Sequence, residues 1–422
     1  MKVAIINRSD ERGGAAVVSA RLMEALRAKG VDARMIVAEK LKSSPYISIA
    51  APQWQLRRAF LAERLGIFLA NGMDRSTLFR IDTAADGVAL WRHPRVREAD
   101  IICLNWVNQG MLSLKGLGKL MELGKPIVWT MHDMWCFTGI CHHAGSCTRY
   151  HGECGDCPLL GDRKGPADLS HAVWRRKEGL YRRPGAPTFV AVSSWLASLA
   201  HRSPLPAVSE AQVIANAFPM PGISAEELAG AKGKDGKTVI VMGAARLDDP
   251  VKGLGDLVEA TRRLAARDSA LAGRLELVTF GNVKNPSALE GFGIAHRHLG
   301  PVRESAIGDI YRGAGVVVSS SSYETLPGTL VEGQAYGCVP VAFDHGGQGD
   351  IVDHLSTGWL CSWSDSPAER ADRLAEGLAW AATRPAGIAA TLVKNVESRF
   401  AAPHIADQYL RLFESLLASR PR

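Results

Sequence analysis

Long apolar runs are missing from this sequence of 422 residues. No stretch approaches the roughly 18 consecutive apolar residues that a membrane-spanning helix needs. The opening residues MKVAIINRSD lack the apolar segment of a signal peptide. Low-complexity tracts are also missing, apart from a Gly/Lys-rich stretch at 229–237, and the composition of 46% apolar and 22% charged residues excludes disorder on the scale of a domain. We therefore expect a folded cytoplasmic protein whose thiols stay reduced.

Short apolar runs rich in Val and Ile recur along the chain, each followed by a polar turn and a helical pattern. Because these runs are continuous rather than alternating, they predict strands buried on both faces, as in parallel α/β sheets. The expected strands are 3–7, 33–38, 100–106, 126–132 and 189–194 in the first half, and 238–244, 275–281, 315–321 and 339–343 in the second.

The series of strands restarts after the stretch 229–237, and the chain is too long for one ordinary core. We therefore expect two doubly wound α/β domains, residues 1–218 and 219–398, with the site in the cleft between them. In the last segment, 399–422, apolar residues from Ile405 to Leu417 recur at helical spacing. This pattern predicts a helix that packs back on the first domain.

The richest chemistry of the second half lies at residues 321–352, where a strand end, a Pro-Gly turn and a helix start follow one another. Unpaired backbone N–H groups and the positive end of a helix dipole make such a turn an anion site that suits a diphosphate. Glu324 and Glu332 bracket the turn and can accept hydrogen bonds from different hydroxyls of one ligand. A capping acid and a solvated helix acid are the plainer alternative. Arg246 and Lys252 follow another strand and can neutralise phosphate charge.

Several stretches of the second half together resemble a known family. GAARLDDPVKGLGDLVEA, VTFGN, HLGPV, ETLPGTLVEGQAYGCVPVAFDHGG and TGWL resemble, in order and spacing, the nucleotide-sugar half of retaining glycosyltransferase family 4, of the bacterial polysaccharide-biosynthesis type. The resemblance implies a GT-B fold, in which two Rossmann-like domains face each other across a cleft and the second holds a nucleoside diphosphate sugar. Gly333 stands where the family usually has Ala, and GGQGD where it more often has GG-Pro-x-Glu, so the choice of donor stays open.

The resemblance also assigns roles to residues. Glu332 would bind the ribose hydroxyls, Glu324 would contact the donor sugar, and the backbone of the Pro-Gly turn would hold the diphosphate. In the first half, Gly13 and Gly14 form a loop that would face the donor, although a tight turn is the favoured explanation of these two glycines taken alone. His132 would contact the donor sugar and could stabilise charge. The expected catalytic residues are His132, Arg246, Lys252 and Glu324, and the expected donor-binding residues are Gly13, Gly14, Gly243, Gly328, Thr329, Leu330 and Glu332.

The implied reaction is transfer of a sugar, with retention, to a hydroxyl of a glycan, and a polyprenyl-diphosphate-linked glycan of cell-surface polysaccharide assembly is the expected acceptor. Asn105, Trp106, Asn108 and Ser194 would line its pocket. The chain has no Asp-x-Asp pair to hold a metal–diphosphate complex, so we expect catalysis without a divalent ion or other cofactor. A nucleotide-sugar epimerase, a phosphorolytic or other GT-B enzyme and an inactive sugar-binding scaffold are the rival interpretations.

The basic residues concentrate in the first half of the chain. Residues 1–218 hold 29 Lys and Arg against 19 Asp and Glu, whereas residues 219–422 hold 21 against 24. The segment 54–75 mixes basic and apolar residues at helical spacing, and 174–183 adds a basic cluster. Such a helix can lie on an anionic membrane surface, here the inner face of the cytoplasmic membrane, or can be an ordinary surface helix with its apolar face in the core.

A short segment, CFTGICHHAGSCTRYHGECGDCP at 136–158, holds five of the eight cysteines and three of the twelve histidines. The spacing of Cys141, Cys147, Cys154 and Cys157 suits a closed tetrahedral zinc site with a structural role. An iron–sulfur cluster, an oxidised pair and simple buried thiols stay open. A zinc-containing nucleic-acid-binding protein, which the pI near 9.0 would allow, is a distant alternative. We expect no nucleic acid partner, because the segment lies between two strands of a sheet domain.

Overall fold

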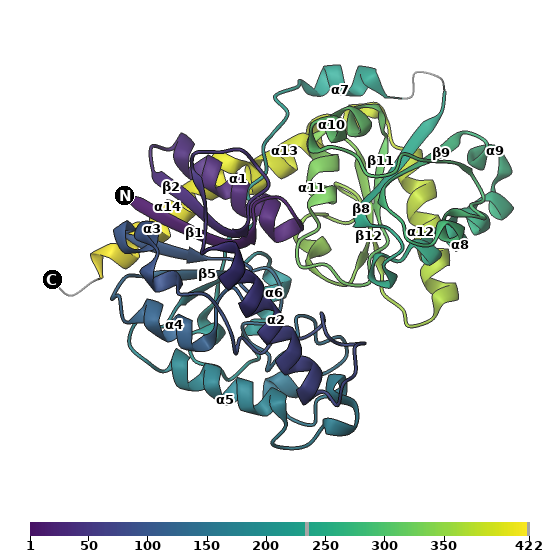
Figure 1. Cartoon of the computed structure of the whole chain (residues 1–422). Helices are drawn as coiled ribbons and strands as arrows, with labels where there is room; N and C mark the ends of the chain where they lie inside the picture. Colours follow the sequence, from purple (N-terminus) through teal and green to yellow (C-terminus); the bar gives the residue numbers. More distant parts are fainter. Residues whose placement is uncertain (233–235, 420–422) are drawn as a thin grey trace. The chain divides into compact units, whose positions relative to one another are not determined.

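The computed structural model describes residues 1–232 and 236–419 and divides into two compact units (Figure 1). Unit 1 comprises Met1–Ala217 and the C-terminal segment that begins at Ala402, and unit 2 comprises Phe218–Ala401. The expected boundaries after residues 218 and 398 therefore lie within a few residues of those in the structure. Part of the Gly/Lys-rich stretch at 229–237 lies outside the described residues.

Unit 1 is built on a parallel seven-stranded sheet in the order β3-β2-β1-β4-β5-β6-β7 within the described residues. Its strands are β1 (Lys2–Ser9), β2 (Asp32–Glu39), β3 (Ile47–Ile49), β4 (Ile101–Leu104), β5 (Ile127–Met131), β6 (Thr188–Ala191) and β7 (Gln212–Val213). Its helices are α1 (Gly14–Ala28), α2 (Gln53–Ala70), α3 (Pro94–Glu98), α4 (Leu114–Met121), α5 (Leu169–Tyr181), α6 (Ser194–Ala200) and α14 (Ala402–Ala418). The central strands β4 and β5 are buried along their whole length, as their continuous apolar runs predict.

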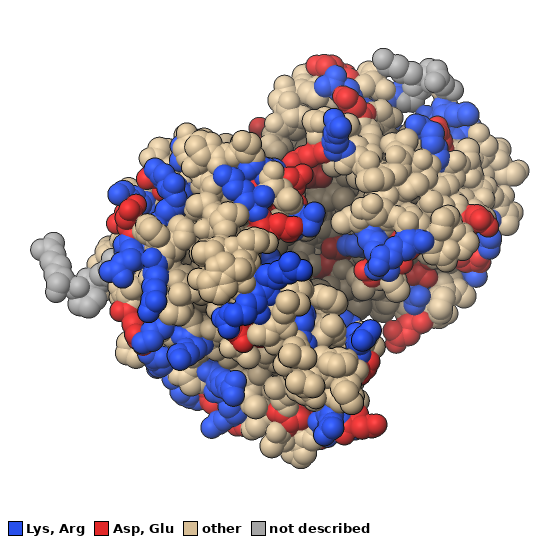
Figure 2. Space-filling view, viewed as in Figure 1, with Lys and Arg blue, Asp and Glu red and all other residues tan. Residues whose placement is uncertain are grey.

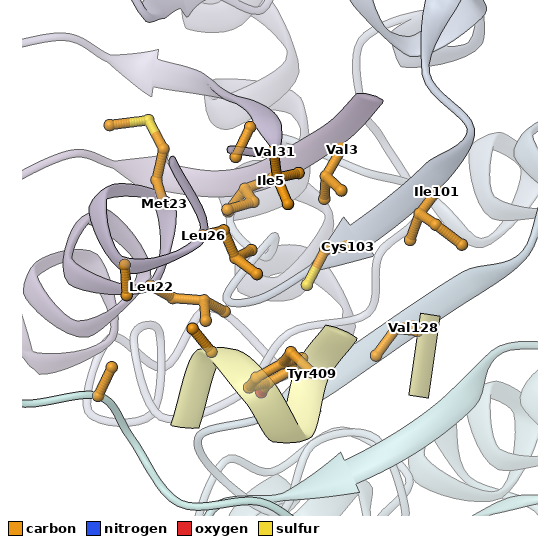
Figure 3. Packing of buried hydrophobic residues seen from close by; sticks show 14 of the residues in the cluster. Val3, Ile5, Leu22, Met23, Leu26, Val31, Ile101, Cys103, Val128 and Tyr409 are labelled. Carbon is orange, nitrogen blue, oxygen red and sulfur yellow. The ribbon is translucent and has the colours of Figure 1, made fainter. Parts of the chain in front are cut away.

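The last helix, α14, completes the core of unit 1. Its apolar face, which includes Ile405, Tyr409 and Phe413, packs in one cluster with α1 and the sheet. Figure 3 shows Tyr409 near Leu22 on this side of the sheet. The Tyr409 hydroxyl also shares a hydrogen bond of 2.9 Å with Thr130 of β5. The end of the chain therefore belongs to the same unit as its beginning.

Unit 2 repeats the architecture with a parallel six-stranded sheet in the order β10-β9-β8-β11-β12-β13 within the described residues. Its strands are β8 (Thr238–Arg246), β9 (Leu275–Asn282), β10 (Ala295–His298), β11 (Val316–Ser319), β12 (Val339–Asp344) and β13 (Trp359–Ser362). Its helices are α7 (Ala225–Ala231), α8 (Leu254–Arg267), α9 (Ser269–Ala272), α10 (Glu304–Gly313), α11 (Gly328–Ala335), α12 (Pro367–Ala382) and α13 (Ala389–Phe400).

In each sheet the order of strand addition reverses at one point, which lies between β1 and β4 in unit 1 and between β8 and β11 in unit 2. This strand order confirms the prediction of two doubly wound α/β units. In such sheets the loops at the carboxyl ends of the strands diverge at this switch point and leave room for a ligand. No helix in the described residues, 1–232 and 236–419, is long and apolar enough to cross a membrane.

Candidate functional site

In unit 2, backbone and side-chain hydrogen bonds join the loops after β8 and β11. Ser322 N donates to the Val251 carbonyl at 2.8 Å, and Ser320 Oγ donates to the Lys252 carbonyl at 2.9 Å. Gly253 has a φ of 64°, and a Cβ at this position would lie 2.0 Å from the Ser320 carbonyl oxygen. Only glycine fits this close approach of the two loops. The joined loops therefore lie at the switch point of unit 2, where β8 and β11 are neighbours.

The joined loops bring two predicted catalytic residues together. Lys252 Nζ lies 2.6 Å from Glu324 Oε1, and the side chains of Lys252 and Glu324 are 28% and 20% exposed. The Glu324 backbone is held from the other side, because Gly347 N donates to its carbonyl at 2.8 Å. An ammonium and a carboxylate are thus both fixed and within reach of solvent. Such a pair can contact a phosphate and a neighbouring sugar hydroxyl of one ligand.

Arg246 ends β8 and is held by a neighbouring acid. Its Nε lies 3.2 Å from Asp248 Oδ1, while Asp248 Oδ2 accepts hydrogen bonds from the backbone N–H groups of Lys284 and Asn285. The Arg246 side chain is 42% exposed. Because Asp248 contacts only Nε in this arrangement, the terminal nitrogens of the guanidinium can bind an anion. Asp248 is thus an orienting residue that the sequence did not reveal.

The predicted anion-binding turn leads into α11, which begins at Gly328 after Pro327 and carries no side-chain cap. The backbone N–H groups of Gly328 and Thr329 have no partner within the helix at this end, whereas Leu330 N donates to the Pro327 carbonyl. Glu332 lies in the second turn of the same helix and is partly buried. Glu324 lies before the turn and Glu332 after it, as the sequence predicts.

Gly243 differs from the other predicted donor-binding residues, because it lies within β8. A Cβ at this position would come within 2.1 Å of the Phe280 ring of β9. Close packing between neighbouring strands therefore accounts for this glycine. Contact of Gly243 with a ligand stays a prediction.

In unit 1, the predicted donor-site residues follow β1 and β5, two strands separated by one other strand of the sheet. Gly13 and Gly14 follow β1, and Gly13 has a φ of 91° and caps α1 without a side chain. A Cβ at either glycine would meet no atom within 4 Å, so the space beside the start of α1 is open. His132 follows β5, and β4 lies between β1 and β5. The glycine loop and His132 thus lie at the same edge of the sheet.

His132 is neutral at pH 7. Its Nε2 is 3.0 Å from Asn105 Oδ1. Burial lowers the pKa of His132 to about 4, although the negative charge of Asp133 acts in the opposite direction. A neutral imidazole can exchange hydrogen bonds with a sugar hydroxyl, but it supplies no positive charge. Charge stabilisation, a further role expected for His132, therefore has to come from other residues.

A buried ion pair lies next to His132. His142 Nδ1 is 2.7 Å from Asp133 Oδ2, and Trp106 Nε1 donates to the same oxygen at 2.8 Å. Burial opposes the charged state of both groups, but their mutual attraction outweighs it. The pKa of Asp133 is consequently lowered to about 2 and that of His142 is raised. The pair joins the Cys-rich segment to the carboxyl ends of β4 and β5, and Asp133 also fixes the Trp106 ring. Sequence spacing could not have predicted this ion pair.

The expected acceptor residues are only partly brought together. Asn105 and Asn108 follow β4 and are buried, and Asn108 Nδ2 has no hydrogen-bond partner among the described residues. Trp106 is partly buried. Ser194 is exposed at the start of α6, after β6. All four lie at the carboxyl edge of the sheet, and their role in acceptor binding stays a prediction.

The predicted zinc site is not supported by the structure. Cys141, Cys147, Cys154 and Cys157 line one cavity of about 20 Å³. However, no three His, Cys, Asp or Glu side chains in the described residues are placed so that they could hold a metal ion. All eight cysteines are free. The sulfurs line the cavity without the tetrahedral arrangement that zinc requires. Of these four free thiols, Cys157 is buried and the other three are partly buried.

Lys177 of α5 holds the start of the Cys-rich segment through hydrogen bonds to its backbone. Its Nζ is fully buried and donates to the carbonyls of Trp135, Thr138 and Gly139. Burial lowers the pKa of Lys177 to about 8. Three backbone carbonyls satisfy the three protons of the ammonium, so one side chain ties this loop to α5.

Comparisons with known proteins bear on the second half of the chain and on the fold. Residues 224–399, less than half of the chain, match the family model described as "Glycosyl transferases group 1". No curated protein sequence matches the chain significantly. Among solved structures, HepE of Anabaena in complex with UDP is similar with a TM-score of 0.62 and 15% identity, over 98% of this chain and 100% of that one.

Two further solved structures share the fold. Sucrose-phosphate synthase from Thermosynechococcus elongatus has a TM-score of 0.60 and 17% identity, over 99% of this chain and 100% of that one. The trehalose 6-phosphate synthase from Burkholderia multivorans has a TM-score of 0.58 and 12% identity, over 99% and 97%. At these identities the likeness establishes the two-unit GT-B fold.

Proposed function

We propose that the chain is a retaining glycosyltransferase of family 4 that binds a nucleoside diphosphate sugar in unit 2. The observation that carries this proposal is the Lys252–Glu324 pair, at 2.6 Å, on the joined loops that follow β8 and β11 at the switch point of the sheet. Arg246 ends β8, and the loop that carries Glu324 leads into α11. The match of residues 224–399 to the glycosyltransferase group 1 model supports it. The complex of the structurally similar HepE with UDP-glucose indicates the class of donor.

Each residue has a distinct role in the proposed donor complex. Glu332 accepts hydrogen bonds from the ribose hydroxyls, and Glu324 accepts them from the sugar. The N–H groups at the start of α11 and the cations Arg246 and Lys252 bind the diphosphate. Lys252 is paired with Glu324 in the ligand-free chain. When the donor binds, Lys252 therefore exchanges its contact with Glu324 for a phosphate, and Glu324 exchanges its contact with Lys252 for a sugar hydroxyl.

The same cations stabilise the transition state. As the bond between the anomeric carbon and the diphosphate oxygen breaks, negative charge grows on the leaving group while the sugar becomes oxocarbenium-like. Arg246 and Lys252 stabilise this charge without a divalent ion. The departing diphosphate accepts the proton of the attacking acceptor hydroxyl, and the new glycosidic bond forms on the face that the diphosphate leaves. His132, neutral at pH 7, orients the sugar by hydrogen bonding.

We further propose that the acceptor is a lipid-linked glycan of cell-surface polysaccharide assembly, modified at the cytoplasmic face of the membrane. Trp106, whose edge is fixed by Asp133, offers an aromatic ring for contact with an acceptor sugar. Asn108, whose buried amide nitrogen has no partner among the described residues, offers a hydrogen-bond donor.

Thermal unfolding in the presence of individual nucleotide sugars tests the donor site. At least one should raise the unfolding temperature, because a ligand at 100 times its Kd stabilises the folded state by about 2.7 kcal/mol. Glu332→Ala should weaken this ligand about tenfold or more, since it removes the acceptor for the ribose hydroxyls. Glu290→Ala, an exposed acid elsewhere in unit 2, is the matched control. Failure of every nucleotide sugar to stabilise the protein would refute the proposal.

With the donor identified, sugar transfer to glycan acceptors in excess chelator tests the reaction itself. Full activity is expected, and strict dependence on Mg²⁺ or Mn²⁺ would contradict the role of Arg246 and Lys252. Conversion of the nucleotide sugar without an acceptor would indicate an epimerase instead.

A further inference from the structure

Helix α2 carries apolar side chains on its outer face as well as on its inner face, where Leu56, Ala59 and Ile67 are buried. Its charged residues Glu63 and Arg64 face inward and are 1% and 6% exposed. Arg64 Nη2 lies 2.6 Å from Asp82 Oδ2, and Glu63 Oε1 accepts hydrogen bonds from the N–H and hydroxyl of Thr83. These buried contacts hold α2 against the segment 78–86 and fix which face of the helix is turned to solvent.

The outer face of α2 is apolar. We define the α2 apolar surface as six large side chains on this helix and the segment that follows it, and all six are more than half exposed. They are Trp54 (65%), Leu61 (55%), Leu65 (56%), Leu69 (59%), Met73 (67%) and Phe79 (60%). The four on α2 recur at intervals of seven or four residues and therefore share one face. These six are among only fourteen exposed large hydrophobic residues in the described chain, so the surface is a concentration rather than scatter.

Positive charge surrounds this surface. Arg57, Arg58, Arg75 and Arg80 are exposed, and within residues 53–80, all of which the structure describes, Asp74 is the only exposed acid. Figure 2 shows Lys and Arg side chains beside uncharged surface on the face where Figure 1 draws α2. Apolar side chains with a cationic border match the interface of a bilayer, where hydrocarbon lies beneath a layer of phosphates.

We propose that the α2 apolar surface binds an anionic lipid bilayer, with α2 lying parallel to the membrane plane. The helix has 18 residues and is therefore about 27 Å long. In this orientation Trp54 and the three leucines enter the boundary between headgroups and acyl chains, while the arginines bind lipid phosphates. The surface is the convex outside of a helix, which suits a flat bilayer. Binding by a second copy of the chain is disfavoured, because a self-complementary contact would place arginines against arginines.

Membrane binding does not depend on the donor chemistry. Its use, the delivery of a lipid-linked acceptor to unit 1, rests on the function proposed above. The two can therefore fail separately. A protein that binds vesicles but no nucleotide sugar would retain this inference and lose the proposed function.

Flotation of the full-length protein with vesicles tests the proposal. Vesicles of phosphatidylglycerol and phosphatidylcholine in a ratio of about 1:2 should bind the protein, whereas pure phosphatidylcholine should bind it at least about tenfold more weakly. The triple variant Leu61→Ser, Leu65→Ser and Leu69→Ser should lose at least about tenfold in affinity for the anionic vesicles. The double variant Leu41→Ser and Leu355→Ser, which changes exposed apolar residues outside the surface, should bind like the wild type.

A second variant separates charge from insertion. Arg57→Gln with Arg58→Gln keeps the apolar side chains and should weaken binding at low salt, with a smaller salt dependence than that of the wild type. Circular dichroism and the unfolding temperature should stay unchanged in all variants, because every altered side chain is exposed.

Three results would overturn the proposal. The first is absence of binding of the wild type to anionic vesicles. The second is equal binding by the triple serine variant, which would leave the apolar surface without a role. The third is a wild-type dimer in light scattering that the triple variant dissociates, without vesicle binding in either, which would assign the surface to self-association. The nucleotide-sugar stabilisation measured on the same variants should match the wild type throughout.

Discussion

At the scale of single residues, Gly253 controls the geometry of the proposed donor site. Its φ is 64°, and only 2.0 Å would separate a Cβ from the Ser320 carbonyl oxygen, so the position allows no side chain. Gly253→Ala should therefore push apart the loops that place Lys252 and Glu324. We expect a loss of about 1–3 kcal/mol in stability and weaker nucleotide-sugar binding, measured by urea unfolding and calorimetry.

Gly255, two residues later, provides the matched control. It lies inside α8, and a Cβ there would meet no atom within 4 Å. Gly255→Ala should leave nucleotide-sugar binding unchanged and stabilise the protein by up to about 1 kcal/mol, because alanine favours the helix. Equal effects of the two substitutions would show that loop geometry at Gly253 is unimportant.

His132 should make the protein sensitive to mild acid. Its pKa is lowered to about 4 in the folded chain, so between about pH 6.5 and 4 the unfolded state binds a proton that the folded state does not. Stability should thus fall by up to about 1.4 kcal/mol for each pH unit over this interval. In urea unfolding at several pH values, His132→Asn should reduce this slope. An unchanged slope would contradict a neutral His132.

His142 serves as a control of opposite sign. Because its folded pKa is raised, its contribution to stability is fully present below about pH 6.5 and is lost as the pH rises through the folded pKa. His142→Gln should therefore alter the pH dependence of stability above pH 6.5, a range in which His132→Asn should have no effect.

Residue types and spacing predicted Glu324, Lys252 and the turn at Gly328, because these lie at strand ends and a helix start. Their orienting partners could not be predicted in the same way. Asp248 acts through backbone N–H groups 36 and 37 residues later, and His142 reaches Asp133 across a loop without regular structure. Such contacts depend on the path of loops, which no periodic pattern records.

At the scale of elements, the strands at the sheet edges escaped prediction. β3, β7, β10 and β13 lie at the ends of the two sheets and have exposed or partly exposed residues. The predicted strands lie inside the sheets and are covered on both faces. A continuous apolar run signals this double burial, so it identifies interior strands and misses edge strands.

The pattern of α2 allowed two interpretations, a helix on a membrane surface and a surface helix with its apolar face in the core. Spacing alone could not distinguish an apolar face turned to the core from one turned to solvent. The structure shows both: Leu56, Ala59 and Ile67 are buried, while the buried partners of Glu63 and Arg64 in the segment 78–86 leave Trp54 and three leucines exposed. The Cys-rich segment is a second case in which spacing was not sufficient. The cysteine spacing predicted a zinc site, whereas in the structure Lys177 holds the start of the segment through hydrogen bonds to backbone carbonyls.

At the scale of the whole molecule, unit 1 depends on both ends of the chain. Phe413 of α14 is fully buried in the cluster that includes α1 and the strands of the first sheet. Phe413→Ala should destabilise unit 1 by about 3–5 kcal/mol, because it leaves a cavity in this core. Hydrogen exchange should accelerate in β1 and β4 of unit 1 more than in β8 and β11 of unit 2.

Glu414, the next residue, is exposed on α14. Glu414→Ala should change stability by no more than about 0.5 kcal/mol. Acceleration of exchange in both units to the same extent by Phe413→Ala would contradict the assignment of α14 to unit 1.

The position of α14 in the core of unit 1 has a consequence for biosynthesis. The ribosome completes the first 217 residues long before it reaches Ala402, and at about 5–20 residues per second the interval is roughly 10–40 s. During this time the apolar surface that α14 will cover stays open on the nascent chain, while the whole of unit 2 is synthesised. Unit 2, although second in the sequence, is therefore the first unit that has all its residues available to fold.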